Sequence, residues 1–151
     1  MTEEAALAGT LVWTFFYGSY INSDVLDEVD FVPRRTEIAR LAGFEIRIAP
    51  LANLVQSDRG VVYGVLASGT HAELERLYAH AEHVLGGVYL PRAVLAERLD
   101  GSYRPALCYI ASEMAEAPPD PNYVQRIVEP ARRFGFPAWY VDRLDSFIDS
   151  A

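Results

Sequence analysis

The stretch FFYGSYIN, residues 15–22, decides how this chain begins to fold. It closes a run from Leu11 to Tyr17 that is rich in β-branched and aromatic residues, as buried strands are. The run stops at Gly18, and three good N-cap residues follow at 22–24. The apolar residues within 25–29 then have the spacing of a short amphipathic helix. The quoted stretch is therefore predicted to be the loop between a first strand and a first helix.

Composition limits the classes of protein that this chain can belong to. Its 151 residues, half of them apolar, suffice for one buried core, so residues 1–151 are predicted to form a single domain. The net charge of -8 and the lack of a Lys/Arg-rich run argue against nucleic acid and against an anionic membrane as partners.

The single cysteine and the N-terminus indicate the compartment. Cys108 has no partner for an intrachain disulfide, and a zinc site of paired thiolates is excluded. The start MTEEAALAGT is acidic and lacks the apolar stretch of a secretory signal, and no run approaches the ~20 apolar residues of a membrane span. We expect a soluble, cytoplasmic protein.

Two further strands are predicted in the first half of the chain. RTEIARLAGFEIRIAP, residues 35–50, alternates partially around Gly43, which suggests a long strand bent at that glycine. GVVYGVLAS, residues 60–68, indicates another buried strand, in which Gly64 suggests a bulge or a close backbone approach.

A helix is predicted over THAELERLYAHAEHV, residues 70–84. Thr70 and Glu73 have the spacing of a capping box, and Gly86-Gly87 ends the segment. One face of this helix carries Leu74, Leu77, Tyr78 and Ala81.

The second half predicts a hairpin and two helices. VYLPRAVLAERL and SYRPALCYIA flank the turn pair Asp100-Gly101, with Cys108 as a core residue. EAPPDPN, residues 116–122, is expected to be irregular, and helices follow over 123–134, where Pro130 should kink or split the helix, and from Pro137 to 148. The order of elements predicts an α+β fold with a mixed or antiparallel sheet rolled toward a small barrel.

Most familiar catalytic and metal motifs are absent. The sequence holds no G-x-S-x-G elbow, P-loop, H-E-x-x-H or G-x-G-x-x-G. His80 and His83 have i, i+3 spacing, but the face lacks a convincing third ligand, so we expect solvated histidines and no metal.

Ser19 and Glu82 are the residues that invite a chemical role. Ser19 follows Gly18 in a turn, where it is either an exposed nucleophile or a local hydrogen-bonding residue of a tight turn. Glu82 lies near the end of a predicted helix, where the macrodipole disfavours a carboxylate. Two interpretations stay open. Glu82 acts as a general acid or base near the mouth of a strand, or it is a surface glutamate without a chemical role.

Four stretches together resemble the γ-glutamylcyclotransferase family. FFYGSYIN resembles the family's strand followed by Tyr-Gly-Ser-Asn, and YAHAEHVLGGVY resembles its Leu-Asp-x-x-Glu-Gly motif followed by Gly-x-Tyr. APPDPNY and ARRFGFPAWYVDRL resemble its Pro-rich loop and tail. The resemblance runs from about residue 12 to 147.

The resemblance implies a set of site residues. Glu82 matches the catalytic glutamate, and no metal is implied. The residues matched to substrate binding are Thr14, Phe15, Phe16, Tyr17, Gly18, Ser19, Tyr20, Tyr89, Tyr109 and Tyr123. Three positions depart from the family's pattern, with Tyr20 for Asn, Ala79 for Asp and His83 for Gly.

The implied reaction needs no cofactor. The α-amine of a γ-glutamyl compound attacks its own γ-carbonyl, so that 5-oxoproline forms and an amine, amino acid or peptide is released. One carboxylate can remove the first proton and deliver the last. Two alternatives are a non-catalytic protein of the same fold that binds a γ-glutamyl-like metabolite, and an amide hydrolase using Ser19. The substrate, a role in glutathione turnover or in biosynthetic deprotection, and a homodimeric state stay open.

Overall fold

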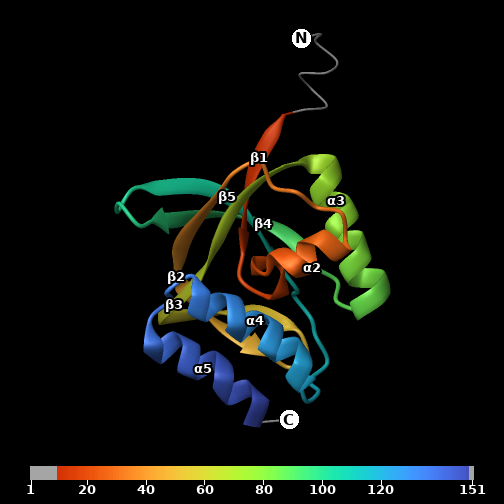
Figure 1. Cartoon of the computed structure of the whole chain (residues 1–151), viewed down its shortest axis with the longest axis vertical. Coiled ribbons are helices and arrows are strands. Elements are labelled where there is room, and N and C mark those ends of the chain that lie inside the picture. The colour runs from red at the N-terminus through yellow and green to blue at the C-terminus, as the bar shows by residue number, and fades with distance from the viewer. Residues whose placement is uncertain (1–9, 150–151) are drawn as a thin grey trace.

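The computed structural model describes residues 10–149 and shows a five-stranded closed barrel (Figure 1). The strand order around the barrel is β1-β3-β2-β4-β5. The bounds are β1 Leu11–Phe16, β2 Thr36–Ile48, β3 Ala52–Thr70, β4 Leu90–Arg98 and β5 Tyr103–Ile110. β1 runs parallel to β5 and every other pair is antiparallel, so the predicted α+β fold with a mixed, barrel-like sheet is confirmed. The prediction about a secretory signal concerns residues 1–9, outside the described part.

Helices cover the barrel on two sides. They are the 3-10 turn η1 Ser19–Ile21, α2 Ser23–Glu28, α3 His71–His80, the π-helical turn η2 Ala81–Leu85, α4 Pro121–Arg133 and α5 Ala138–Asp149. α4 and α5 lie side by side next to β2 and β3, whereas α3 lies away from them, beyond α2 (Figure 1). None of the helices within residues 10–149 has the length and apolar character needed to cross a membrane.

The predicted strand, loop and helix at the start of the chain are confirmed. β1 ends at Phe16, and α2 begins after Asn22, whose side chain accepts a hydrogen bond from the N–H of Asp24 at 2.9 Å. The Asn22 amide also donates to the Arg126 carbonyl at 2.9 Å, which ties the loop to α4. The cap therefore fixes both the start of α2 and its place against the C-terminal helices.

Two glycines shape the long strands as predicted. Gly43 has φ +91° at the register shift between Ala42 and Phe44, so β2 bends there. A Cβ added to Gly64 would lie 2.2 Å from the Phe16 carbonyl oxygen, which confirms a close backbone approach. β3 begins at Ala52, earlier than predicted, because pairing with β2 extends it through a polar stretch.

Local sequence signals predicted the ends of the helices better than they predicted the helix interiors. The capping box of Thr70 and Glu73 is present, and Gly86, with φ +82°, follows the last helical turn. Asp120 caps α4, so residues 121–122 belong to a helix and not to the predicted irregular loop. The prediction that Pro130 kinks or splits its helix is wrong about a split, because α4 runs unbroken and its buried face packs into the core.

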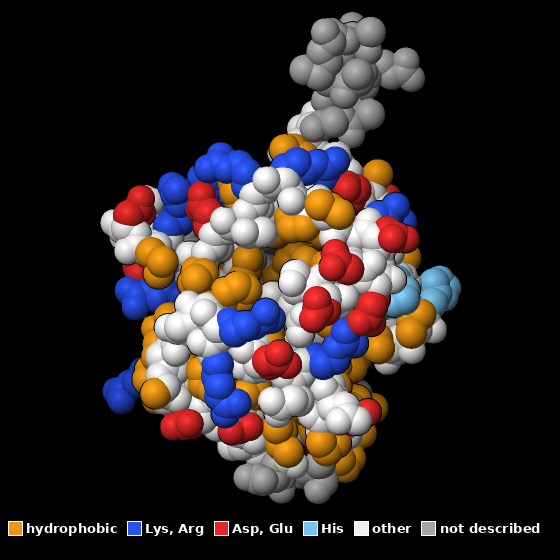
Figure 2. All heavy atoms as spheres, in the orientation of Figure 1, with side chains coloured by type: hydrophobic (Ala, Val, Ile, Leu, Met, Phe, Trp, Pro, Cys, Tyr) orange, Lys and Arg blue, Asp and Glu red, His pale blue; other side chains and the backbone are white. Residues whose placement is uncertain are grey.

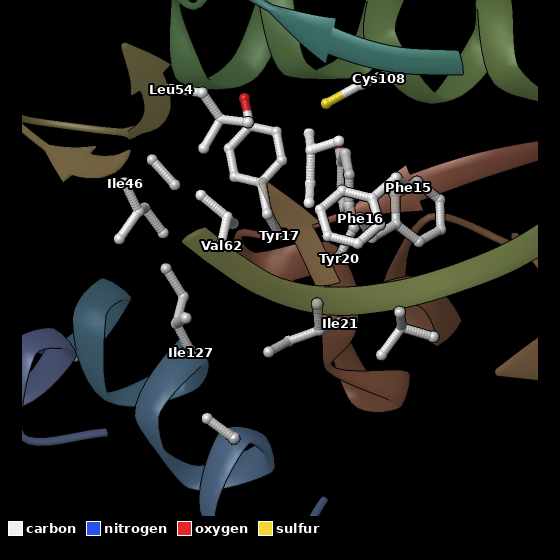
Figure 3. Close-up of a cluster of buried hydrophobic side chains, with 14 of the residues drawn as sticks. Phe15, Phe16, Tyr17, Tyr20, Ile21, Ile46, Leu54, Val62, Cys108 and Ile127 are labelled. Carbon is white, nitrogen blue, oxygen red and sulfur yellow. The ribbon is translucent and has the colours of Figure 1, made fainter. Parts of the chain in front are cut away.

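The core joins the barrel interior to α4 (Figure 3). Ile46, Leu54 and Val62 from β2 and β3 lie near Tyr17, and Ile127 of α4 closes this side. Cys108 is fully buried, as predicted. The ring of Tyr17 thus stands inside the barrel, at the point where β1 turns into its loop.

Candidate functional site

A small cavity opens where β1 ends, between the loop that follows β1 and the last turn of the α3 segment. We call it the tyrosine cavity. Its lining consists of Phe16, Tyr17, Gly18, Ser19, Tyr20, Ala52, Tyr78, Ala81, Leu85, Tyr89, Tyr109 and Tyr123. About 30 Å³ is open to the centre of a water-sized sphere, room for little more than ordered water. A ligand the size of an amino acid therefore requires lining side chains to move.

Most of the predicted ligand-binding residues meet in this cavity. The eight that line it are Phe16, Tyr17, Gly18, Ser19, Tyr20, Tyr89, Tyr109 and Tyr123. Thr14 and Phe15 are fully buried and do not line it. Thr14 donates to the Leu107 carbonyl at 3.1 Å, and Phe15 packs on Gly64, so both contribute to the barrel instead.

The main chain of one residue, Ala52, holds two of the tyrosines. The N–H of Ala52 donates to the phenol oxygen of Tyr123 at 2.9 Å, and the carbonyl of Ala52 accepts from the phenol of Tyr89. A Cβ on Gly18 would approach the Cβ of Ala52 to 2.8 Å. The glycine in the Tyr-Gly-Ser loop is therefore required for the close fit of the loop against the start of β3.

Other phenols are also bound to main-chain carbonyls. Tyr17 donates to Tyr109 O at 2.7 Å, and Tyr20 donates to Leu77 O at 3.1 Å. The ring of Tyr78 stacks on Tyr109 with centroids 3.8 Å apart and meets Tyr20 edge-on at 5.6 Å. These contacts give the cavity a firm aromatic wall.

The cavity wall is electrically neutral at physiological pH. Its lining contains no Asp, Glu, His, Lys or Arg. Burial raises the pKa of Tyr17 and Tyr78 well above the usual value, and burial raises the pKa of Tyr123 to about 12 against opposing hydrogen bonds from Ala52 and Ser19. Within residues 10–149, no three His, Cys, Asp or Glu side chains are grouped so that they could hold a metal ion.

The structure does not bring Glu82, the residue matched to the family's catalytic glutamate, into the lining of this cavity. Glu82 is exposed and does not line it, whereas its neighbour Ala81 is 2% exposed and does. Ala81 continues the buried face of Leu74 and Leu77 at the spacing of an ordinary α-helix, and the adjacent Glu82 lies off that face.

Four lining residues were not predicted as site residues: Ala52, Tyr78, Ala81 and Leu85. For Tyr78 and Ala81 a signal existed, since both were predicted on one face of the helix. Leu85 lies one helical turn beyond Ala81 on the same side. Ala52 offers no signal, because its contribution is its main chain.

Comparison with solved structures supports the fold. A structure titled "Gamma-glutamyl cyclotransferase" is 22% identical, with a TM-score of 0.75 over 91% of this chain and 88% of that chain. An uncharacterized protein from Homo sapiens is 22% identical, with a TM-score of 0.76 over 90% and 87%. A protein from Arabidopsis thaliana is 26% identical, with a TM-score of 0.58 over 93% and 87%. The chain is thus similar in fold to all three.

Comparison with protein-family models identifies a family for the chain. No curated protein matches the chain. The model of the AIG2-like family matches residues 61–144, a segment that runs from the middle of β3 into α5 and includes the α3 segment and Tyr123. Because this match spans more than half of the 151 residues, the chain belongs to the AIG2-like family.

Proposed function

We propose that the tyrosine cavity binds the γ-glutamyl part of a small metabolite. The observation that carries this proposal is the convergence of eight predicted ligand-binding residues, from distant parts of the sequence, on one cavity. Membership of the AIG2-like family and the similarity in fold to a structure titled "Gamma-glutamyl cyclotransferase" support the class of ligand.

The loop after β1 supplies donors for a carboxylate or a carbonyl oxygen. The first hydrogen bond of the turn η1 runs from Ile21 N–H to Gly18 O at 3.1 Å, so the N–H groups of Ser19 and Tyr20 precede it. The phenol oxygen of Tyr123 accepts from Ala52, which leaves its own proton for another acceptor. The hydroxyl of Ser19 hydrogen-bonds with the same phenol.

The lining of the cavity offers no carboxylate that could act as a base. This geometry therefore favours a protein that binds the γ-glutamyl ligand without converting it. A cyclotransferase must move a proton from the α-ammonium to the leaving nitrogen while the ring C–N bond forms and the amide C–N bond breaks. Phenols that stay protonated are poor bases for the first of these transfers. An amide hydrolase has the same difficulty, because Ser19 has no histidine or carboxylate beside it in the lining.

A cyclotransferase is the second candidate. It is favoured by family membership and by the position of Glu82 directly beside the inward-facing Ala81. In this case a γ-glutamyl amine, amino acid or peptide would be converted to 5-oxoproline, in glutathione turnover or in biosynthetic deprotection.

Calorimetric titration with a panel of γ-glutamyl amino acids, followed by mass spectrometry of the same mixtures, tests both candidates. We expect saturable binding with no 5-oxoproline and no free glutamate. Glu82→Gln should leave affinity unchanged within about twofold, because the side chain is exposed. Formation of 5-oxoproline that Glu82→Gln lowers by ~10² or more would establish the cyclotransferase instead. Absence of binding to the whole panel would overturn the ligand class.

A further inference from the structure

A second, larger hollow lies beside α2, separate from the tyrosine cavity. We call it the α2 groove, and it is bounded by α2, the loop that follows it, the start of β2 and the C-terminal end of α4. Its volume of about 710 Å³ is within the roughly 300–1,000 Å³ of small-molecule sites. The two hollows share only Phe16 and Tyr20, whose rings stand between them.

The floor of the α2 groove is apolar. Phe31 is 1% exposed, Val65 lies beside it on the lining, and the half-exposed Phe134 forms part of the rim. Figure 2 shows hydrophobic side chains in a depression on this face of the molecule, with acidic side chains along one border. Such a floor favours a ligand with an apolar body.

Two charges at the groove have no ion-pair partner among the described residues. They are Asp27 of α2 and Arg133 at the end of α4, and both are exposed. The neighbouring charges are already paired, Glu28 with Arg126 and Arg132 with Asp145.

The remaining carboxylate of the lining is also occupied. Glu37 accepts two hydrogen bonds from Arg98, at 2.9 and 3.1 Å, and lies near Arg35 and Arg104. The groove thus presents one free carboxylate and one free guanidinium above an apolar floor, and these two do not pair with each other.

We propose that the α2 groove binds a short apolar peptide with free ends, the N-terminal ammonium at Asp27 and the C-terminal carboxylate at Arg133. A zwitterion satisfies both unpaired charges at once, which a simple amine, acid or neutral molecule does not. Two or three apolar residues fit the volume and place their side chains on Phe31 and Val65. This site is independent of the γ-glutamyl site and requires no turnover.

Titration of the whole protein with L-leucyl-L-phenylalanine tests the proposal. The matched probes are its N-acetyl and C-terminal amide forms, which keep the apolar body and each remove one end charge. We expect saturable binding of the dipeptide and about three- to tenfold weaker binding of either blocked form, because exposed charge pairs contribute modestly. In the Asp27→Asn variant, the N-acetyl form should bind as tightly as the free dipeptide. In the Arg133→Gln variant, the C-terminal amide should bind as tightly as the free dipeptide.

Matched control variants lie close to Asp27 and Arg133 in the sequence. Asp24→Asn and Arg132→Gln remove nearby exposed charges that do not line the groove, so they should leave dipeptide affinity unchanged. Equal binding of all three probes, or no binding of the free dipeptide, would overturn the proposal. A dimer in sedimentation that Phe134→Ser dissociates, without dipeptide binding, would assign the groove to a second copy of the chain and would also overturn it.

Discussion

The main chain of Ala52 holds Tyr123 and Tyr89 at once, by donating its N–H to the first phenol at 2.9 Å and by accepting the proton of the second at its carbonyl. Ala52 starts β3, whereas Tyr123 belongs to α4 and Tyr89 precedes β4. The main chain of this one residue thus joins three segments at the tyrosine cavity. It also fixes which way the phenol proton of Tyr123 is free to point.

The first prediction concerns that phenol. Tyr123→Phe should weaken γ-glutamyl ligand binding by about tenfold, because a charge-assisted hydrogen bond is lost. It should also lower the free energy of unfolding by about 1–3 kcal/mol, since the N–H of the buried Ala52 loses its acceptor. Calorimetric titration and urea unfolding measure the two effects. Tyr103→Phe, at an exposed position outside the cavity, is the control, and an equal effect of both variants would contradict the role of Tyr123.

The second prediction concerns the fit of the loop. In Gly18→Ala the new Cβ would lie 2.8 Å from the Cβ of Ala52, so the loop or the start of β3 must shift. Overpacking of this kind costs about 1–3 kcal/mol of stability, and ligand affinity should fall with it. In the double variant Gly18→Ala with Ala52→Gly the clash disappears, so thermal unfolding should show a loss smaller than the sum of the single losses. Strict additivity would show that this contact does not set the loop position.

The sequence predicted the features that local chemistry determines. Asn22, the Thr70 and Glu73 capping box and the bend at Gly43 each depend on residues near in sequence, and each is confirmed. The Tyr-Gly-Ser loop was also placed correctly, because an aromatic strand, a glycine and an N-cap leave few alternatives.

The incorrect predictions concern segments whose structure depends on contacts with residues far away in the sequence. The polar first part of β3 is a strand only because β2 pairs with it. Thr14 and Phe15 were assigned to the cavity with their neighbours, yet barrel contacts with Leu107 and Gly64 occupy them. A motif match placed the catalytic residue at Glu82, whereas the buried face of the helix continues through Ala81, which lines the cavity.

The third prediction concerns alkaline pH. Burial raises the pKa of Cys108 from 9.0 to about 12 and that of Tyr123 from 10.0 to about 12. Between pH 9 and 12 the unfolded chain therefore releases protons that the folded chain retains, so stability is fully present below pH 9 and falls as pH rises through this window. Urea unfolding at a series of pH values measures the slope. Cys108→Ala should make the slope shallower, and flat stability up to pH 11 would contradict the burial of these groups.

The last prediction follows from the positions of Ala81, which lines the cavity, and Glu82, which is exposed. Ala81 is the position of the π-helical turn whose side chain enters the cavity, so Ala81→Glu places a carboxylate beside the γ-glutamyl site. Desolvation by the tyrosines should raise its pKa and make it an effective base, which can add ~10² to 10⁴ in rate.

We therefore expect Ala81→Glu to form 5-oxoproline from γ-glutamyl amino acids faster than the wild type by at least about 10², with the rate rising as the new carboxylate ionises. Burial of the larger side chain should lower the melting temperature, so circular dichroism must accompany mass spectrometry of the product. Ala79→Glu is the matched control, because it adds the same charge to an exposed position of α3 and should form no 5-oxoproline. A folded, ligand-binding Ala81→Glu protein that shows no gain, beside a wild type whose turnover disappears in Glu82→Gln, would show that Glu82 reaches the cavity after all.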